Sequence, residues 1–560
     1  MAKLNNKFLF FTTSPRTPAK MIPEIQLLCE KFSGKKWDKE NQREFSRCLK
    51  FSPFFKGETS KKESDFSARD RITRAPKSLG FVNLKPCIEL TEAGQALLSG
   101  KRIQEVFLRQ LLKFQLPSPY HTKNEKNTET FYVKPYLEIM RLVYELEYLT
   151  FDELKIFAIQ ITDYHKYEDV KAKIIHFRQE KEQHKGEYKR FVNEIWTNTV
   201  LEIYSEEIAA GETKTRETRD TGIVKFVKTK KGTMRDYADA CFRYIRYTEL
   251  FVFSGHSICV AEDKVKDVKY ILSSIDRNPV FINDVNQYKS YLFSANNPVL
   301  YADNKDNLVE FIMSISDHTK QELNDLDIES LKDLRDEIIA YNKESIIHEQ
   351  VAEIKSYALY SEIINTFNGI VSKEYYDAPL MFEYNTWRAM TMLDGGDIKG
   401  NFKFDDMGGP ISTASGNMPD IECDYDEYSL SVEVTLQSGQ RQYETEGEPV
   451  ARHYGQLKKK SGKDTYCLFI APKINEATLA HFYGLNHLPI ALYGGKSKIV
   501  PLELNQFIHL VKNSYNYRTQ PTPADVRRFL DLAIEQGEMA TDENDWKVRI
   551  QNCIETWLVS

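Results

Sequence analysis

Hydrophobic residues recur at helical spacing along much of the N-terminal half of the chain, and short alternating runs separate these stretches. The first unit has helical spacing at 22–32, then the basic stretch KKESDFSARDRITRAPKSLG, then the string LGFVNLKPCIELTEAGQALL. That last string predicts a short strand, a turn containing Pro86, a second strand and a helix entered through the N-cap Thr91. This order of elements is typical of a winged helix, whose hairpin is the wing.

A second unit with the same plan follows the polar loop HTKNEKNTET. FYVKPYLEIMRLVYELEYL is amphipathic, and Thr150 with Glu153 predicts a capping box at the start of the next helix. MRDYADACFRYIRYTELFVFSGHSICV then predicts a helix followed by a two-stranded hairpin. From about 270 to 369, apolar residues at three- and four-residue spacing and opposite charges at i, i+4 predict a helical connector.

Helix and strand alternate in the remainder of the chain. MFEYNTWRAMTML, PVARHYGQLKKK and INEATLAHFYG predict helices, IECDYDEYSLSVEVTL predicts a hairpin, and TYCLFIAP, LPIALYGG and KIVPLEL predict strands. We therefore expect a multidomain protein with two α+β winged-helix-like recognition subdomains, an all-α helical linker and an α/β domain with a mixed central sheet. The expected boundaries are 1–125, 126–270, 271–369 and 370–560.

Composition narrows the class of protein. A chain of 560 residues with 41% hydrophobic and 28% charged residues is globular and long enough for several domains. The eight cysteines show no CxxC pair or Cys/His spacing suited to zinc, so we expect reduced thiols. The N-terminus lacks the features of a signal peptide, and no run of about 18 apolar residues occurs, so we expect a soluble intracellular protein that does not enter a membrane.

The net charge of −6 is unevenly distributed. Residues 1–80 hold 18 basic and 9 acidic side chains, whereas residues 377–433 hold 12 acidic and three basic ones. A basic end suits DNA phosphates, and an acidic segment is either solvated or binds cations. The candidate DNA contacts are the basic residues before the first wing and a basic stretch that we interpret as a loop: Arg69, Arg71 and Arg74, and then Lys225, Lys228, Lys230, Lys231 and Arg235. A solvent-exposed basic surface without a ligand remains the alternative for both groups.

The acidic segment contains a pattern that favours metal chemistry. Asp420, in PDIE, is expected on the first strand of the predicted hairpin, and Glu433, in SVEVT, on the second. Carboxylates that face each other across two strands can share Mg²⁺, which prefers oxygen ligands and can activate water for attack on a phosphodiester.

This arrangement resembles the PD-(D/E)xK nuclease signature, with Thr435 where the motif normally has lysine. The missing cation predicts that further carboxylates have taken over part of its role. Glu446, just before the next predicted helix, and Glu383, on the preceding helix, are the candidates.

Several strings considered together resemble one family. FEYNTW, TASGNMPDIE, VEVT, EGEPVARHY and YCLFIAP look like the cleavage domain of the AlwI-type family of type IIS restriction endonucleases, which includes strand-specific nicking enzymes. FSARDR, LGFV with LTEAG, and FRYIRYTELFV resemble its recognition region. The resemblance implies binding to a short asymmetric site in double-stranded DNA and cleavage a short distance to one side of it.

Carried over position by position, the catalytic acids of this family fall on Glu383, Asp420, Glu433 and Glu446. The resemblance implies that Asp420, Glu433 and Glu446 bind Mg²⁺. His453, twenty residues after Glu433, either orients a phosphate or water or is an ordinary histidine on a helix surface.

Other functions stay open at this stage. The main alternative is a winged-helix DNA-binding regulator with a non-catalytic C-terminal domain, and a nuclease for RNA or branched DNA is a third class. One nuclease domain holds one site, so a double-strand break needs a second copy of the chain or a small nuclease subunit. The family resemblance further implies a prokaryotic, cytoplasmic protein.

Overall fold

The computed structural model describes residues 2–4, 6–52, 54–55, 64–123, 129–215, 218, 220–393, 397–414, 418–516 and 521–558. Parts of three predicted segments, 61–63 in the basic stretch, 124–128 in the polar loop and 415–417 before Asp420, lie outside the described residues. The chain divides into two compact units, Met1–Lys332 and Asp333–Ser560, and the division falls inside a long helix. The four finer domain boundaries stay predictions.

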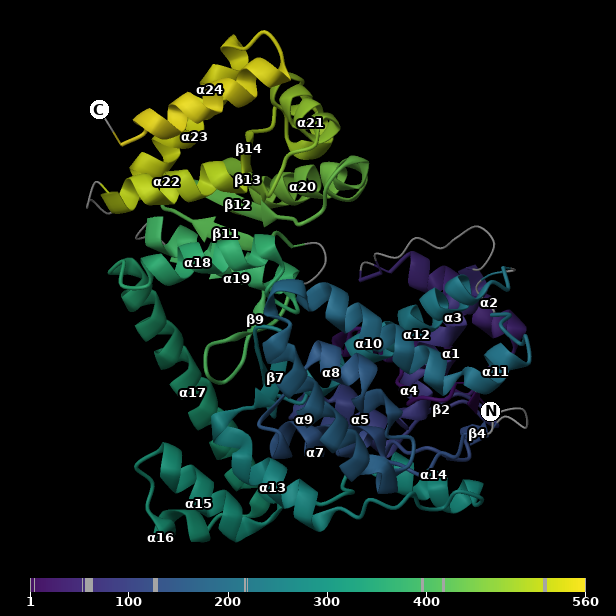
Figure 1. The fold of residues 1–560 in the computed structure, drawn as a ribbon. Helices are drawn as coiled ribbons and strands as arrows, with labels where there is room; N and C mark the ends of the chain where they lie inside the picture. The colour runs from purple at the N-terminus through teal and green to yellow at the C-terminus, as the bar shows by residue number, and fades with distance from the viewer. Residues whose placement is uncertain are drawn as a thin grey trace. The chain divides into compact units, whose positions relative to one another are not determined.

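Unit 1 is mainly helical, as the apolar spacing predicted (Figure 1). Its first 125 residues contain β1 (Ala2–Leu4), α1 (Met21–Phe32), α2 (Lys39–Lys50), α3 (Ser64–Thr73), α4 (Ala75–Ser78), β2 (Val82–Asn83), β3 (Glu89–Leu90), α5 (Glu92–Leu98), α6 (Ile103–Lys113) and β4 (His121–Lys123). The β2–β3 hairpin and the Thr91 cap, whose hydroxyl accepts from Gly94 N at 3.0 Å, confirm the predicted local structure. Whether this unit functions as a winged helix stays a prediction.

The second part of unit 1 also follows the predicted plan. It contains α7 (Pro135–Glu145), β5 (Tyr148–Thr150), α8 (Phe151–Ile156), α9 (Tyr167–Gln183), α10 (Tyr188–Ile203), α11 (Ser205–Ala209), α12 (Ile223–Arg246), β6 (Phe251–Ser254) and β7 (Ser257–Val260). The capping box of Thr150 and Glu153 and the β6–β7 hairpin are confirmed, and β5 extends the hairpin to the antiparallel order β5-β7-β6.

The predicted connector is helical throughout its long segments. It comprises α13 (Val265–Ser274), α14 (Val285–Phe293), α15 (Lys305–Ile315), α16 (Lys320–Asn324), α17 (Ile328–Lys355) and α18 (Tyr360–Ser372). Its i, i+3 and i, i+4 apolar pattern forms helices because residues at that spacing share one helix face.

Unit 2 contains a five-stranded mixed sheet of order β14-β13-β12-β11-β8. The strands β8 (Asp397–Gly400), β11 (Ile421–Asp424) and β12 (Tyr428–Val434) are antiparallel neighbours, and β13 (Asp464–Ala471) and β14 (Ile499–Glu503) add in parallel. A separate short pair is formed by β9 (Lys403–Phe404) and β10 (Pro410–Ser412). This confirms the predicted α/β domain with a mixed sheet.

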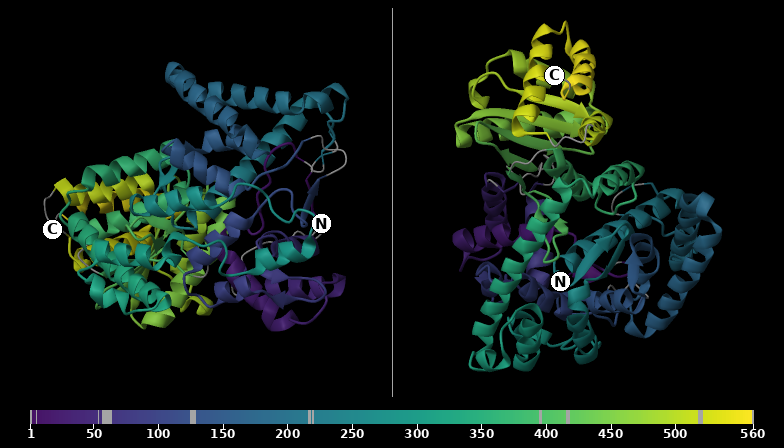
Figure 2. Two further views of the ribbon diagram at one scale, coloured as in Figure 1. Left: turned by 90° about the horizontal axis from the view of Figure 1, so that it is seen from below. Right: turned by 90° about the vertical axis from the view of Figure 1, so that its left-hand side faces the viewer.

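Helices cover both faces of this sheet. Alternate residues of β13 point to opposite faces: Leu468 packs with α19 (Ala378–Leu393) and α22 (Leu504–Asn516), and Phe469 packs with α20 (Gln440–Ser461) and α21 (Glu476–His487). The last helices, α23 (Pro523–Met539) and α24 (Glu543–Thr556), join the core that contains Leu468. The right-hand view of Figure 2 shows the strands beneath these C-terminal helices.

Two predictions about elements of unit 2 are wrong. LPIALYGG is not a strand but a turn of 3₁₀ helix at Ala491–Tyr493, bracketed by one isolated bridge between Ile490 and Gly495. The consecutive glycines at 494 and 495 both have positive φ, which ends any extended pairing. The helix predicted to start near Pro449 starts at Gln440 instead, with Pro449 inside it.

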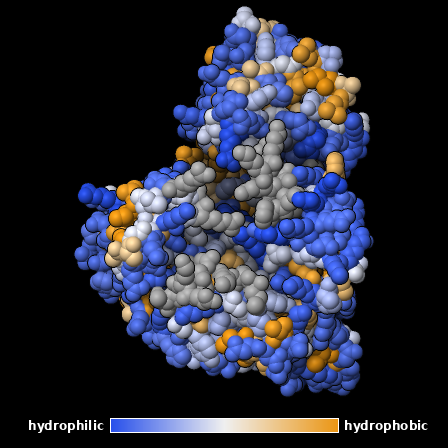
Figure 3. Space-filling model, turned by 90° about the vertical axis from the view of Figure 1, so that its right-hand side faces the viewer, coloured by the Kyte–Doolittle hydropathy of each residue, from blue (hydrophilic) through white to orange (hydrophobic). Residues whose placement is uncertain are grey.

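The face drawn in Figure 3 is mainly hydrophilic, with scattered apolar residues. The eight cysteines are free thiols, four of them buried. Across the described ranges, no helix has the length and apolar character needed to cross a membrane.

Candidate active site

The β11–β12 hairpin sets Asp420 opposite Glu433. Ile421 pairs with Val432 across the two strands, so the residues one step further along lie opposite each other on the other face. The Asp420 carboxylate is fixed by Val434, whose backbone N–H donates to Oδ2 at 2.8 Å. Burial raises the pKa of the Cys467 thiol on β13, and the negative charges of Glu433 and Asp420 raise it further. The charges of both carboxylates therefore act on the same side chain, Cys467, on the strand next to β12.

Helix α20 contributes two side chains above the same face. His453 Nδ1 and Glu433 Oε1 are 2.7 Å apart, and the Thr435 hydroxyl donates to Glu446 Oε1 at 3.0 Å. Glu446 and His453 are seven residues apart, so they lie on one face of the helix. Glu433 and Thr435 are two residues apart in an extended segment, so their side chains point to the same face of the sheet. Two side-chain contacts thus tie β12 and the residue after it to α20, at points two turns apart on the helix.

Glu446 lies inside α20, not just before the helix as predicted. Pro449 suggested a helix start because proline is favoured in the first turn and lacks the N–H that an interior position needs. The structure accommodates it in the third turn, and the helix gains the residues 440–448. Glu446 is therefore held on a rigid element.

Glu383 lies on α19 and is buried, with 8% of its surface exposed. Its Oε2 accepts a hydrogen bond from the backbone N–H of Ala414 at 2.9 Å. Ala414 belongs to the segment that leads into Asp420, so Glu383 anchors that segment to the helix.

Three further acids in and near the hairpin have basic partners. Glu422 contacts Lys460 at 3.1 Å, Asp424 contacts Lys463 at 2.8 Å, and Glu448 contacts Arg452 at 3.2 Å. The structure thus places a cation beside each of these three acids. Such surface pairs contribute little stability, but they reduce the local negative charge.

Two residues that support the site carried no signal in the sequence. Asn401 donates from its backbone N–H to Asp420 O at 2.9 Å and from its side chain to Pro419 O at 2.8 Å. Gln442 is fully buried and donates to Gln437 O and Lys473 O, which fixes the first turn of α20. Both are amides within polar stretches, and only their tertiary contacts reveal the role.

The carboxylates suit magnesium, but with fewer protein ligands than predicted. Within the described part of the chain, no three His, Cys, Asp or Glu side chains gather as a group that could hold a metal ion, so Asp420, Glu433 and Glu446 do not form one three-acid cluster. Magnesium, however, is commonly bound by one or two carboxylates together with waters and phosphate oxygens. The facing pair of Asp420 and Glu433 fits that requirement.

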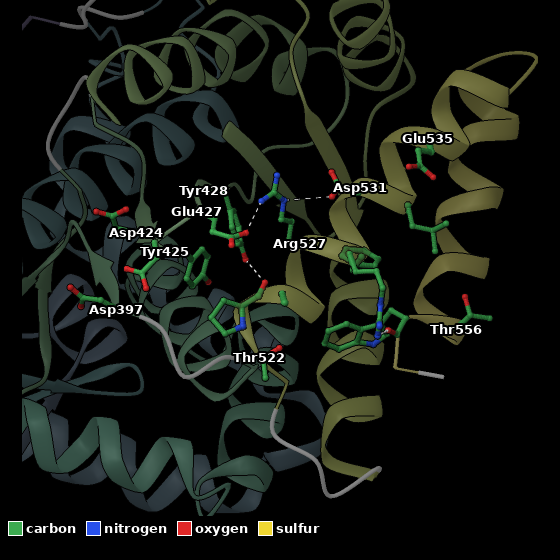
Figure 4. A pocket seen from close by; sticks show the side chains of 17 residues that line it. Asp397, Asp424, Tyr425, Glu427, Tyr428, Thr522, Arg527, Asp531, Glu535 and Thr556 are labelled. Atoms are coloured by element: carbon green, nitrogen blue, oxygen red, sulfur yellow. Dashed lines mark hydrogen bonds and ion pairs between the residues drawn. The ribbon is translucent and has the colours of Figure 1, made fainter. Parts of the chain in front are cut away.

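A cavity of about 1120 Å³ lies at the opposite end of the hairpin. It is lined by the turn between β11 and β12 and by α23, with Glu427, Asp531 and Arg527 among its side chains (Figure 4). Arg527 is held by Glu427 at 3.2 Å and by Asp464 at 3.1 Å. Because most of the charged groups on this rim are acidic, the cavity does not suit DNA phosphates.

The three arginines predicted to contact DNA in the first unit have partners within the protein. Arg71 forms an ion pair with the buried carboxylate of Glu24, which shows a structural role for it. Arg69 and Arg74 both contact Asp70, at 2.9 and 2.8 Å, and keep about a third of their side chains exposed.

The basic stretch of the second unit is a helix, which corrects the prediction of a loop. Lys225, Lys228, Lys230, Lys231 and Arg235 all lie in α12. Phe226, Val227 and Met234 are buried at helical spacing and fix this conformation. The sequence predicted a loop because the stretch contains many lysines and Gly232.

Two facing carboxylates on a hairpin, in a mixed sheet enclosed by helices, form the arrangement that the sequence pattern predicted for a nuclease domain. The family model of the AlwI restriction endonuclease matches residues 77–510. The chain belongs to this family and is a nuclease that acts on DNA.

Two solved structures are similar to parts of the chain. The small subunit R.BspD6I2 of the heterodimeric restriction endonuclease R.BspD6I has 25% sequence identity and a TM-score of 0.30, with 34% of this chain and 97% of that one covered. The BpuJ1 endonuclease binding domain, solved with modified DNA, has 12% identity and a TM-score of 0.32, with 53% and 98% covered. A search of curated proteins finds no match.

Proposed function

We propose that the protein is a type IIS site-specific endonuclease that binds a short asymmetric site in duplex DNA and hydrolyses a phosphodiester a short distance outside it, with Mg²⁺ as cofactor. The observation that carries the proposal is the position of Asp420 opposite Glu433, each fixed by a hydrogen-bonding partner. Family membership supports the DNA substrate.

In this proposal the carboxylates of Asp420 and Glu433 hold the metal ion. When bound, Mg²⁺ lowers the pKa of water and neutralises charge that develops on the phosphoryl group. The backbone N–H of Val434 keeps Asp420 oriented, and His453 keeps Glu433 oriented. Glu446, held by Thr435 at Oε1, accepts the proton of the attacking water.

Unit 1 supplies recognition in this proposal. The β2–β3 and β6–β7 hairpins, each following helices, support two winged-helix-like subdomains. Because this proposal places one active site in unit 2, at the acidic pair found among its described residues, one chain cuts one strand, and a double-strand break needs a second copy or a small nuclease subunit.

Incubation with supercoiled plasmid and Mg²⁺ tests the proposal. We expect nicked or linear product whose sequenced ends lie at a fixed distance from one recurring asymmetric sequence. EDTA should stop the reaction. Ends scattered without a common sequence, or no cleavage at any Mg²⁺ concentration, would contradict it.

His453→Ala should lower the cleavage rate by about 10–100-fold, since residues that orient a metal ligand typically contribute this much. His453→Asn, whose side-chain amide can still donate to Glu433, should recover part of the loss. Single-turnover rates over a Mg²⁺ titration measure both variants. An unchanged rate for His453→Ala would mean that this histidine serves packing alone.

A further inference from the structure

The exposed side of α12 carries a row of cations that becomes visible only because the segment is helical. Lys225, Lys228 and Arg235 are all exposed, and their spacing of three and seven residues places them on one side of the helix. At 1.5 Å per residue the row extends about 15 Å, a length over which one DNA strand presents about four phosphates.

The remaining lysines of the stretch are engaged inside unit 1. Lys230 Nζ lies 4.4 Å from the centre of the Tyr204 ring, and Lys231 donates to Asn193 Oδ1 at 2.9 Å and lies over the Trp196 ring. Burial, and then the charge of Lys155, lowers the pKa of Lys231. These two cations are therefore committed to packing α12 against its neighbours.

The acids of α12 are paired with arginines. Asp236 contacts Arg16 at 3.3 Å, and Asp239 contacts Arg243 at 3.2 Å. Arg235 lies 3.8 Å from Asp236, so Arg16 and Arg235 share that carboxylate. The row consequently keeps a net positive charge.

Gly232 lies between Lys228 and Arg235 on the same side of the helix. A Cβ at this position would meet no atom within 4 Å, so packing does not require glycine here. Glycine inside a helix costs about 0.5–1 kcal/mol relative to alanine. Because glycine has no side chain, a ligand can approach the helix backbone closely at this position, which is consistent with the row of cations.

We infer that the exposed side of α12, defined by Lys225, Lys228, Gly232 and Arg235, is a docking surface for the phosphate backbone of duplex DNA. The inference rests on the proposed function and specifies which part of unit 1 holds the substrate. Charge complementarity to phosphate, the length of the row and the open space at Gly232 favour DNA, whose strand presents a regular line of phosphates, over an acidic protein.

The test uses the full chain, a fluorescent random-sequence duplex and EDTA to prevent cleavage. The triple variant Lys225→Gln/Lys228→Gln/Arg235→Gln is compared with Lys173→Gln/Lys269→Gln/Lys320→Gln, which removes three exposed cations from α9, α13 and α16. Glutamine is a good helix former, so circular dichroism and melting temperature should match wild type. Each lost phosphate contact reduces the slope of log K against log salt by about 0.9, so the α12 variant should lose about 2.7.

We expect the control variant to keep the wild-type slope. Gly232→Leu keeps all three cations and should weaken binding by blocking close approach. Equal slopes for wild type and the α12 variant, or equal losses in both triple variants, would overturn the inference. If wild type itself shows no salt-dependent binding, the proposed function fails first, and the two failures are thereby distinguished.

Discussion

Asp420→Asn is expected to lower the single-turnover rate of DNA cleavage by roughly 10³-fold or more and to leave DNA affinity within about twofold of wild type. Asparagine keeps an oxygen that can accept from Val434 N–H, so the local backbone contact survives. The substitution removes only the charge that faces Glu433. The loss is expected in the rate because these carboxylates stabilise charge in the transition state and do not recognise the DNA sequence.

Asp426→Asn is the matched control. Asp426 lies in the turn at the opposite end of the same hairpin, is exposed, and undergoes the same chemical change. Its cleavage rate should equal that of wild type. If Asp420→Asn cuts plasmid at near the wild-type rate, or if both variants lose activity equally, the assignment of Asp420 to the active site is wrong.

The nuclease sheet follows from local sequence pattern to a large extent. IECDYDEYSLSVEVTL forms two strands in which hydrophobic and polar residues alternate. Its hydrophobic positions Ile421 and Val432 pack into one core, which leaves Asp420 and Glu433 on the other face. The hairpin register, and hence the facing pair, was therefore predictable. The amide contacts of Asn401 were not, because they join residues about twenty positions apart.

The errors have a common physical origin. Residues with poor intrinsic preference for a helix, Gly232 in α12 and Pro449 in α20, are held in helices by tertiary packing of the buried faces around them. Local preference predicted a loop and a helix start at these two places. The corrections matter for function because they align the cations of α12 on one side and place Glu446 two turns before His453.

The role of Thr435 can be tested through Glu446. Thr435 replaces the lysine of the PD-(D/E)xK signature, and its hydroxyl donates to Glu446 Oε1 while it accepts from Gln437 N. Thr435→Val removes this donor at nearly constant volume and should reduce the single-turnover rate by about 10-fold, while Thr435→Ser should retain most activity. Glu446→Gln should reduce the rate by about 100-fold or more, and Glu383→Gln by less, because Glu383 contacts the segment leading to Asp420.

A double-mutant cycle decides whether Thr435 acts by positioning Glu446. If it does, Thr435→Val/Glu446→Gln should be no slower than Glu446→Gln alone, because residues that act as a unit give non-additive losses. Losses that add would mean that Thr435 has an independent role. Thr435→Lys restores the residue of the signature, but its ammonium group would compete with Mg²⁺ for the carboxylate of Glu433 and would pair with that of Glu446, so we expect a slower enzyme that recovers partly at high Mg²⁺ concentration. A faster Thr435→Lys enzyme combined with an unaffected Glu446→Gln enzyme would show that the carboxylate of Glu446 has not taken over the role of the lysine.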